Sequence, residues 1–423
     1  KMAFSLIIMA VLCILAVPIS FSIGLAAAGG LLLSDLSLVI IAQRMFTQVD
    51  MFAMLAIPFF ILAGSLMDKG GISLKIVNFS SQLVGHIRGG LGMVVILACM
   101  IFGAISGSGA ACTAAIGMIM IPAMKKKGYP EEFTAALIAA SGPLDVIIAP
   151  SIVMVIYATT ANVSVGDMFL AGYMPGILIA AALMIICFIY AKKYNFPAEP
   201  RPTFQSFFKA FGESIWAILM IVIIMGGILC GFFTATEAGV VAVVYAVIVG
   251  KYVYKGLRYR DIPQIVAESV LTTSAVMFCV ATTNVLAWGL ISQRIVEQAT
   301  NFLLSISSSP VVFLIIANIL FLFLGMIMDS TPAIILSTPI LLPVAQQLGI
   351  DPIHFGIICV VNLAIGMSTP PVGITLFVAS SVSKQPISKM LKPLIPMWIS
   401  MLVFLMIITY VPEVSLFLPN LFS

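Results

Sequence analysis

Residues 362–373 read NLAIGMSTPPVG, in which a glycine, two prolines and several polar side chains interrupt an apolar segment. The segment 141–151, SGPLDVIIAPS, interrupts an earlier apolar run in a similar way. Proline lacks a backbone N–H and clashes with the carbonyl one turn back, so we expect each segment to break a helix. The two breaks are related in position, because Pro150 and Pro371 belong to a series of residues that recur at a single offset.

That offset is 221, and it relates other residues that determine backbone shape. Five positions recur at it without exception: Pro122, Gly128, Pro150, Ala158 and Pro175 as Pro343, Gly349, Pro371, Ala379 and Pro396. Gly103 recurs as Gly325 at an offset of 222. Since glycine and proline constrain the backbone rather than fill surface, their repetition predicts a duplicated, broken backbone. In an apolar chain, paired interrupted segments indicate the binding site of a secondary transporter.

Composition places the chain in the membrane. Of its 423 residues, 62% are hydrophobic and 9% are charged, whereas roughly a quarter of a soluble domain is charged. Apolar runs long enough to cross a bilayer recur throughout, so we expect an all-α polytopic membrane protein with one integral membrane domain, 1–423. No basic stripe alternates with aromatic residues, which gives nucleic-acid binding no support. The seven cysteines and two histidines are scattered, and they form no metal or catalytic cluster.

Hydropathy divides the chain into spans and two further segments. We expect membrane spans at about 2–33, 51–67, 131–163, 168–191, 215–233, 238–250, 265–290, 353–383 and 394–418. The apolar stretches 90–127 and 310–347 each carry a polar break near the middle, and each half is too short to cross ~30 Å of hydrocarbon. We interpret both as re-entrant helical hairpins. The predicted repeats are 1–191 and 215–418, each with one hairpin and one broken helix: 90–127 and 131–163 in the first, 310–347 and 353–383 in the second.

The positive-inside rule predicts an orientation for this arrangement. If both stretches are hairpins, all 20 Lys and Arg residues except Arg44 and Arg294 collect on one side, Lys1 included. The N-terminus is then cytoplasmic and the C-terminus periplasmic. The two hairpins enter from opposite faces, which is an inverted-topology repeat.

The breaks and hairpin tips also predict chemistry. Carbonyls freed from helical pairing must be buried or line a cavity, and a sodium ion bound by carbonyl, Ser, Thr and Asn oxygens would satisfy them. Helix N-termini at the tips suit a carboxylate. Asp145 and Asp329 are intramembrane carboxylates, so we consider a cation role for the first and a substrate role for the second. Close packing of Ser and Gly, and a helix cap at Asp329, are the structural alternatives. Hydroxyl groups that would add contacts are those of Ser106, Ser108, Ser151, Ser330 and Thr331.

Four stretches resemble the large membrane subunit of TRAP transporters, the tripartite ATP-independent periplasmic transporters. They are GAISGSGAACTAAIGMIMIPAMKKKGY from Gly103, FLAGYMPG from Phe169, GMIMDSTPAIILSTPILLPV from Gly325 and GIDPIHFGIICVVNLAIGMSTPPVG from Gly349. Two departures are Ala149–Pro150–Ser151, where many members resemble Pro-Pro-Ser, and Asp145, where the family usually has a small residue.

The resemblance implies an elevator-type importer in the bacterial inner membrane, driven by a sodium gradient and without a cofactor. It implies three kinds of partner besides membrane lipid: a periplasmic substrate-binding protein, a small four-helix membrane subunit and an organic acid anion. By motif position, one sodium site would involve Gly103, Ser106, Gly142, Asp145 and Ile148. The other would involve Gly325, Asn362, Gly366, Met367 and Thr369. The substrate would lie between the tips, near Ser108, Ser151 and Asp329.

Substrate and coupling remain open at this point. Tip hydroxyls together with an additional carboxylate favour a sialic acid over a C4-dicarboxylate. Proton coupling through Asp145 or Asp329, or passive ion conduction through a channel, are the alternatives. We expect no enzyme activity, because HExxH and GxSxG motifs are absent, and the lack of a nucleotide-binding loop agrees with gradient drive.

Overall fold

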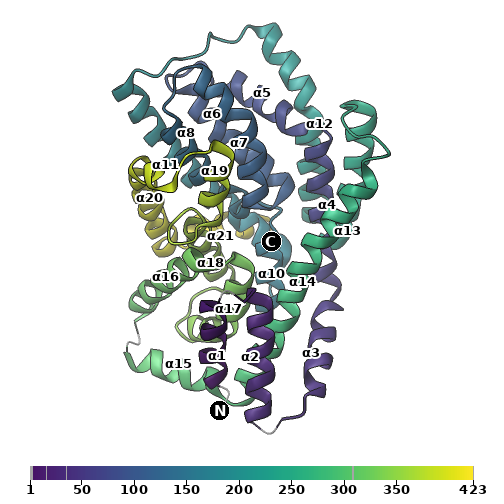
Figure 1. The fold of residues 1–423 in the computed structure, drawn as a ribbon, viewed down its shortest axis with the longest axis vertical. Helices are drawn as coiled ribbons and strands as arrows, with labels where there is room; N and C mark the ends of the chain where they lie inside the picture. Colours follow the sequence, from purple (N-terminus) through teal and green to yellow (C-terminus); the bar gives the residue numbers. More distant parts are fainter. Residues whose placement is uncertain (1–2, 16, 35, 307–308, 423) are drawn as a thin grey trace.

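The computed structural model describes residues 3–15, 17–34, 36–306 and 309–422. Lys1, which we counted among the cytoplasmic charges, lies outside these ranges. Within them, every regular element is a helix (Figure 1). The predicted all-α class is confirmed.

Among the described residues, seven helices are long and apolar enough to cross a membrane, and the bent pair Glu131–Ile147 and Ile152–Ala161 would make an eighth. The prediction of a polytopic membrane protein is confirmed. The seven are η1 with α4 (Phe52–Lys69), α11 (Val165–Tyr194), α12 (Phe204–Leu229), α13 with η2 (Ala235–Val253), α14 (Ile262–Ser292), α16 (Pro310–Ile327) and α20 (Ile387–Tyr410). The expectation that each half of 310–347 is too short to cross is wrong for α16, which is 18 residues long and strongly apolar.

The expectation of one span over residues 2–33 is wrong. This run forms two helices, α1 (Ala3–Ile14) and α2 (Ile19–Leu33), which pack side by side and run antiparallel (Figure 1). Pro18 precedes α2 in an extended conformation, so the run is broken there. The predicted span 394–418 is also shorter, because α20 ends at Tyr410 and is followed by the separate helix α21 (Glu413–Phe422), which packs on α11.

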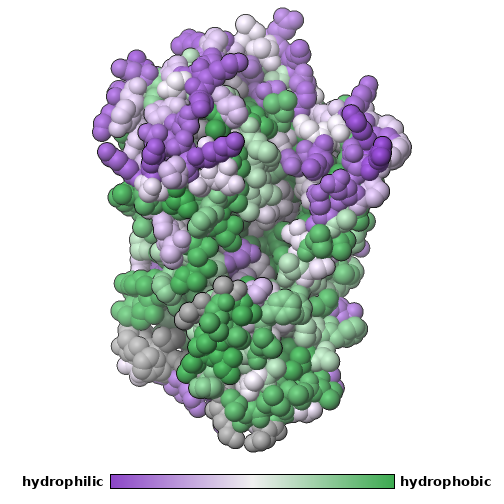
Figure 2. Space-filling view, in the orientation of Figure 1, coloured by the Kyte–Doolittle hydropathy of each residue, from purple (hydrophilic) through white to green (hydrophobic). Residues whose placement is uncertain are grey.

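The α1–α2 hairpin changes the predicted position of the N-terminal end. One end of the molecule is hydrophilic (Figure 2), and the chain passes from α11 to α12 at that end (Figure 1). The last turn of α11 contains Lys192 and Lys193. The start of α1 lies at the opposite end (Figure 1). The single crossing that we assumed for residues 2–33 is therefore absent, and the side of the membrane that each terminus faces stays a prediction.

Two helical hairpins lie where polar residues break the apolar stretches. The first joins α6 (Gly90–Ser106) to α7 (Gly109–Lys126), and the second joins α16 to α17 (Ser330–Gln347). Gly107, at the first tip, has φ +64°, a left-handed conformation that glycine adopts without a steric cost. Each hairpin turns within two residues, so each presents a short polar tip.

The helix order of the first half recurs in the second. α7 begins at Gly109 and α17 at Ser330, an offset of 221, while α5 (Ile72–Val84) and α15 (Ile295–Ile306) begin at an offset of 223. The broken helices correspond in the same way. Their bounds are α8 (Glu131–Ser141), α9 (Leu144–Ile147) and α10 (Ile152–Ala161) in the first half, and α18 (Pro352–Met367) and α19 (Ile374–Ser383) in the second. The remaining helix is α3 (Val39–Val49).

The two halves interlock through exchanged contacts. α2 of the first half packs on α14 of the second, while α13 of the second packs on α4 of the first. The hairpins exchange partners similarly, because α10 packs on α17 and α19 packs on α7 (Figure 1). Equivalent helices thus make equivalent contacts across the halves, and neither half forms a separate core.

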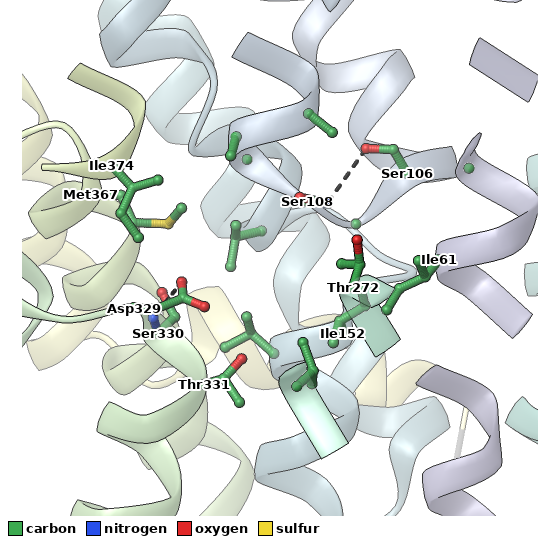
Figure 3. A pocket seen from close by; sticks show the side chains of 18 of the residues that line it. Ile61, Ser106, Ser108, Ile152, Thr272, Asp329, Ser330, Thr331, Met367 and Ile374 are labelled. Carbon is green, nitrogen blue, oxygen red and sulfur yellow. Dashed lines mark hydrogen bonds between the residues drawn. The ribbon is translucent and has the colours of Figure 1, made fainter. Parts of the chain in front are cut away.

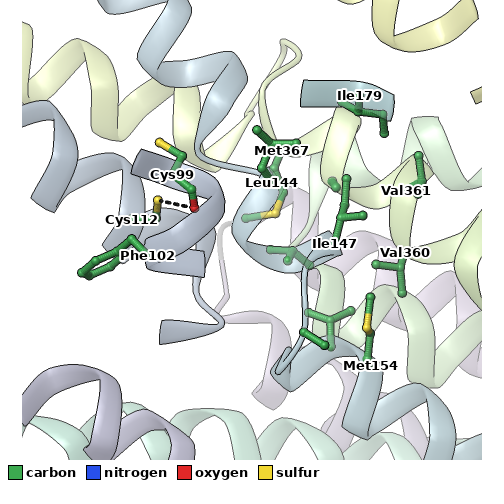
Figure 4. Close-up of a cluster of buried hydrophobic side chains, with 14 of the residues drawn as sticks. Cys99, Phe102, Cys112, Leu144, Ile147, Met154, Ile179, Val360, Val361 and Met367 are labelled. Atoms are coloured by element: carbon green, nitrogen blue, oxygen red, sulfur yellow. Dashed lines mark hydrogen bonds between the residues drawn. The ribbon is translucent and has the colours of Figure 1, made fainter. Parts of the chain in front are cut away.

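The interior between the first hairpin and the broken helices is apolar and closely packed (Figure 4). Phe102, Leu144, Met154 and Val360 are almost completely buried and belong to one cluster that extends through most of the chain. The thiol of Cys112 is buried beside the Cys99 carbonyl in the same cluster, and both cysteines are free. This packing holds the first hairpin against the broken helix formed by α8 and α9.

Candidate functional site: a polar cavity between two hairpin tips

A cavity of about 360 Å³ lies between the two hairpin tips; we call it the tip cavity. Ser106 and Ser108 reach it from the first tip, and Asp329, Ser330 and Thr331 reach it from the second (Figure 3). The two tips belong to different halves of the sequence, yet they face each other across this space. Five of the six predicted substrate-binding residues therefore lie on one cavity.

Two helix N-termini point into the tip cavity. α7 begins at Gly109, and its N-cap residue Ser108 makes no side-chain capping bond. α17 begins at Ser330, whose N–H donates to Asp329 Oδ1 at 2.8 Å. The first N–H groups of a helix have no intrahelical acceptor and carry a partial positive charge, so α7 offers unused donors to a negatively charged group. Asp329 occupies part of the equivalent position on α17.

Ser151 is the sixth predicted residue, and it does not line the cavity. It is completely buried beneath the first tip, where a Cβ on Gly107 would lie 3.5 Å from the Ser151 Cα. The Ser151 and Ser330 hydroxyls are both buried and have no hydrogen-bond partner. Burying a hydroxyl without a hydrogen-bond partner costs folding free energy. Both hydroxyls therefore have a free donor and acceptor at or just beneath a tip.

Asp145 lies directly behind the first tip. Its side chain is completely buried, and Oδ2 accepts a 2.6 Å hydrogen bond from Ser106 Oγ. Oδ1 has no partner. Gly103 packs on the same residue, since a Cβ on Gly103 would lie 2.5 Å from the Asp145 Cα. The structure thus brings together three of the five residues of the first predicted sodium site.

The other two residues of that set lie at the ends of α9. The Gly142 carbonyl accepts a hydrogen bond from the Asp145 N–H at 3.2 Å. Ile148 follows the last turn of α9 in an extended conformation, and its side chain packs on Gly176 of α11. Gly142 is therefore bonded to Asp145 through the backbone, whereas the Ile148 side chain points to a different helix.

The second predicted sodium set surrounds the other broken helix. Gly325 of α16 lies against Gly366 of α18, with a Cβ on Gly366 only 2.6 Å from the Gly325 Cα. Asn362, one turn earlier on α18, is completely buried, and its Nδ2 donates to Asn318 Oδ1 at 2.6 Å. Asn362 Oδ1 has no partner. Asn318 was not predicted, because nothing in the α16 sequence distinguishes it as a partner of the break.

Hydroxyl groups of the protein donate hydrogen bonds to some of the backbone carbonyls that the helix breaks leave without a helical partner. The sequence did not predict these hydrogen bonds. Thr375 Oγ1 donates to the Met367 carbonyl at 2.9 Å, and Tyr173 donates to the Ala149 carbonyl at 3.1 Å. The Thr369 hydroxyl donates back to the Ile365 carbonyl at 2.8 Å. Not every freed carbonyl therefore needs a bound cation. The evidence for a cation is the side-chain oxygens of Asp145 and Asn362 that have no hydrogen-bond partner.

Sequence reasoning missed the wall of the tip cavity that faces the tips. Ser65 and Asp68 of α4 and Thr272 of α14 line it. Asp68 accepts a 2.6 Å hydrogen bond from Ser73 Oγ. No Lys or Arg is among the residues that line the cavity. Asp68 was missed because it precedes Lys69 at the end of α4, and charged residues are common at the ends of ordinary helices.

These features define a multi-pass helical membrane protein in which Ser, Thr and Asp side chains of two hairpin tips meet at a cavity beside broken helices. This is the architecture of a secondary transporter. Residues 6–414 match the family described as the tripartite ATP-independent periplasmic transporter, DctM component. The chain therefore belongs to the TRAP transporter family as a large permease, which is a multi-pass transport protein rather than an enzyme.

Individual relatives carry different substrate names. The chain is 42% identical over 400 residues to the C4-dicarboxylate TRAP transporter large permease DctM of Pseudomonas aeruginosa, covering 94% of both chains. It is 37% identical over 406 residues to the sialic acid permease SiaM of Vibrio cholerae, covering 96% of this chain and 95% of the relative. The solved YdaH transporter of Alcanivorax borkumensis shares the fold, with a TM-score of 0.59 at 12% identity and coverage of 87% and 86%.

Proposed function

We propose that this chain is the large permease subunit of a sodium-coupled importer for an organic acid anion. The anion binds in the tip cavity, and sodium binds behind each tip. The observation that carries this proposal is that two helix N-termini meet at one cavity. Each of the two broken helices beside it also holds a buried side-chain oxygen without a hydrogen-bond partner, on Asp145 and on Asn362. Helix N-termini bind carboxylates, and a cation would satisfy a buried oxygen that no donor reaches.

The first cation site consists of Gly103, Ser106, Gly142, Asp145 and Ile148, and the second of Gly325, Asn362, Gly366, Met367 and Thr369. Asp145 supports the first assignment, since a buried carboxylate requires a compensating charge and the Ser106 hydroxyl fills only one of its oxygens. The carboxylate, hydroxyl, amide and backbone carbonyl oxygens of these two sets suit a hard cation such as sodium. Sodium binding drives transport only if its affinity differs between the two orientations of the cavity.

We favour a sugar acid of the sialic acid type over a C4-dicarboxylate. The tip cavity contains the carboxylates of Asp68 and Asp329 and no basic side chain among its lining residues. A dianion would bring two further negative charges to these carboxylates, and like charges in a low dielectric repel strongly. A substrate with one carboxylate and several hydroxyls would place its carboxylate at the α7 N-terminus and donate hydroxyls to Asp329.

The repeated helix order supports an elevator arrangement of inverted repeats. In this proposal the hairpins are re-entrant and move together with the broken helices, while α4, α13 and α14 remain fixed in the bilayer. The lysine-rich end is cytoplasmic by the positive-inside rule. The start of α1 is then periplasmic, in contrast to our first expectation. The tip cavity reaches Asp68, next to Lys69 at the end of α4, so it extends toward the cytoplasmic side.

The partners in this proposal are a periplasmic substrate-binding protein and a small four-helix membrane subunit. Uptake of labelled N-acetylneuraminate and succinate into vesicles containing all three proteins tests the function. We expect sodium-dependent accumulation of N-acetylneuraminate that is lost when the binding protein is withheld. Accumulation driven by a proton gradient without sodium would establish proton coupling instead, and ion current through the permease alone would establish a channel.

A further inference from the structure

A second cavity lies between α3, α10, α14 and α17, toward the end of the molecule at which α1 starts (Figure 1). It measures about 270 Å³ and is lined by Arg44 and Gln48 of α3, Asn284 and Trp288 of α14, and residues of α10 and α17. We call it the arginine cavity. No Asp or Glu is among its lining residues. Its charge is therefore the opposite of that in the tip cavity, which contains two carboxylates and no cation.

The side chains of the arginine cavity are arranged to receive an anion. The Arg44 guanidinium lies 5.1 Å from the centre of the Trp288 ring, and no described carboxylate pairs with it. A cation–π contact with the indole favours the guanidinium at this position and does not use its N–H groups as donors to an oxygen acceptor. Asn284 Nδ2 donates to Gln48 Oε1 at 2.8 Å, which leaves the Gln48 amide NH₂ as a further donor. A guanidinium fork with an adjacent amide matches a carboxylate.

The two cavities lie along the same helices. On α10, Ile152 lines the tip cavity and Thr159 lines the arginine cavity. On α14, Thr272 lines the first and Asn284 the second, twelve residues later, or about 18 Å along the helix axis. α17 also contributes to both, and Figure 1 shows α14 running past α10 and α17. The cavities are successive positions along one interface.

The repeat relates the fixed walls of the two cavities. Four α4 residues line the tip cavity, and four α14 residues line the arginine cavity. The two sets are equivalent in the repeat at an offset of 223, which also separates the starts of α5 and α15. The α4 residues Ile61, Gly64, Ser65 and Asp68 correspond in order to the α14 residues Asn284, Ala287, Trp288 and Ile291. The wall that faces the tips on one side of the molecule thus has its counterpart on the other side.

We infer that the arginine cavity is an outer carboxylate-binding subsite. An organic acid anion binds there first, with its carboxylate on Arg44 and Gln48, and then passes along α14 to the tip cavity. This inference rests on the proposed function, because it assumes that an anion enters from the side opposite the lysines. The subsite explains how a transporter without a basic residue in its tip cavity attracts an anion. The Arg44 guanidinium would attract the anion to the entrance electrostatically.

Uptake kinetics test the subsite. Arg44→Gln removes the charge from an exposed side chain, and Arg44→Lys keeps the charge without the planar fork. Arg294→Gln is the matched control, because it removes one positive charge from the same end of the molecule outside the cavity. We expect Arg44→Gln to raise the half-saturating concentration of N-acetylneuraminate roughly tenfold while the maximal rate changes little. The half-saturating concentration for Arg44→Lys should lie between those of the wild type and Arg44→Gln. The value for Arg294→Gln should match that of the wild type.

A direct binding measurement separates this inference from the proposed function. With Trp216 and Trp398 replaced by Phe, Trp288 is the remaining tryptophan of the three in the chain. Titration with N-acetylneuraminate or succinate at constant ionic strength should change its fluorescence, and Arg44→Gln should abolish the change. If the wild type transports no organic acid, the proposed function fails, whereas the titration still decides the subsite. A fluorescence response that Arg44→Gln preserves, or unchanged uptake kinetics, would overturn the inference.

Discussion

Gly366 lies so close to Gly325 that a Cβ on Gly366 would be 2.6 Å from the Gly325 Cα. The repeat-related pair, Gly103 and Asp145, is equally close, with a Cβ on Gly103 at 2.5 Å from the Asp145 Cα. In both halves a hairpin helix therefore meets a broken helix through direct backbone contact. This contact sets the position of each break relative to its tip.

Adding a methyl group at this contact should displace α18 from α16. Real Cβ atoms do not approach backbone atoms this closely, so Gly366→Ala forces the two helices apart. We expect a loss of about 1–3 kcal/mol in folding stability, as for other overpacked sites, and a weaker sodium response. Thermal unfolding of the purified protein in detergent, with and without sodium, measures both effects.

Gly226→Ala is the matched control for this variant. Gly226 lies within α12, and a Cβ there has no atom within 4 Å. Alanine is the better helix former, so this substitution should be neutral or stabilising by about 0.5–1 kcal/mol. Equal destabilisation by the two substitutions would contradict a specific role for the Gly325–Gly366 contact.

Removing the charge of Asp145 should weaken the first cation site. Asp145→Asn keeps the shape of the side chain and an oxygen for the Ser106 hydroxyl, but it lacks the negative charge that we assign to sodium binding. We expect the half-saturating sodium concentration for uptake to rise roughly tenfold, because a charge in a low-dielectric site contributes strongly to ion affinity. Uptake at stepped sodium concentrations measures the change.

The control for the Asp145 variant is Glu268→Gln, which neutralises an exposed carboxylate on α14. Its sodium dependence should match that of the wild type. If Asp145→Asn shows the same sodium dependence but loses a response to pH, the site binds a proton instead, and the sodium assignment at Asp145 is wrong.

Local sequence signals account for the parts of the fold that were predicted. The hairpins at 90–127 and 310–347 were located because glycine, serine and proline interrupt apolar runs, and such residues determine the backbone conformation wherever they occur. The α1–α2 turn was missed although Pro18 marks it, because the apolar run continues across it and hydropathy alone registers no break.

The parts of the site that were missed depend on contacts between distant segments. Asp68 and Thr272 lie in different halves of the sequence, and each belongs to a regular helix. Only the packing of α4 and α14 around the tips brings them to the cavity. The same holds for Asn318, whose role becomes visible only through its 2.6 Å bond to Asn362. Periodicity and turn chemistry carry no information about such pairs.

The Asn318 amide should orient Asn362 for cation binding. Asn318 also bonds Thr409 Oγ1 of α20 at 3.2 Å, which holds the amide in place. The Asn362 NH₂ donates to Asn318 Oδ1 and to the Ile358 carbonyl, at 2.6 and 2.7 Å. Asn318→Leu removes the first of these acceptors, which costs about 1–3 kcal/mol and loosens the orientation of Asn362 Oδ1. We expect a lower unfolding temperature and a higher half-saturating sodium concentration.

Asn318→Asp distinguishes orientation from packing in this network. It keeps an acceptor for Asn362 Nδ2 at similar volume, so the sodium response should return toward that of the wild type, while Asn318→Leu stays impaired. If both variants lower stability and neither changes the sodium response, Asn318 supports only the packing of α16 on α18.

The charge of Asp329 should determine the choice between substrate classes. Asp329 caps α17 through its bond to the Ser330 N–H, and asparagine is an equally good cap, so Asp329→Asn changes the charge while the helix start is retained. A sugar acid loses a strong acceptor for its hydroxyls, whereas a dicarboxylate escapes repulsion. We therefore expect N-acetylneuraminate to bind several-fold more weakly and succinate to compete better, a combined change in preference of roughly tenfold.

Competition between labelled N-acetylneuraminate and unlabelled succinate measures this ratio. An equal change in both half-saturating concentrations would show that the Asp329 carboxylate does not contact the substrate, and Asp329→Ala would then report only the lost cap, about 1 kcal/mol of stability.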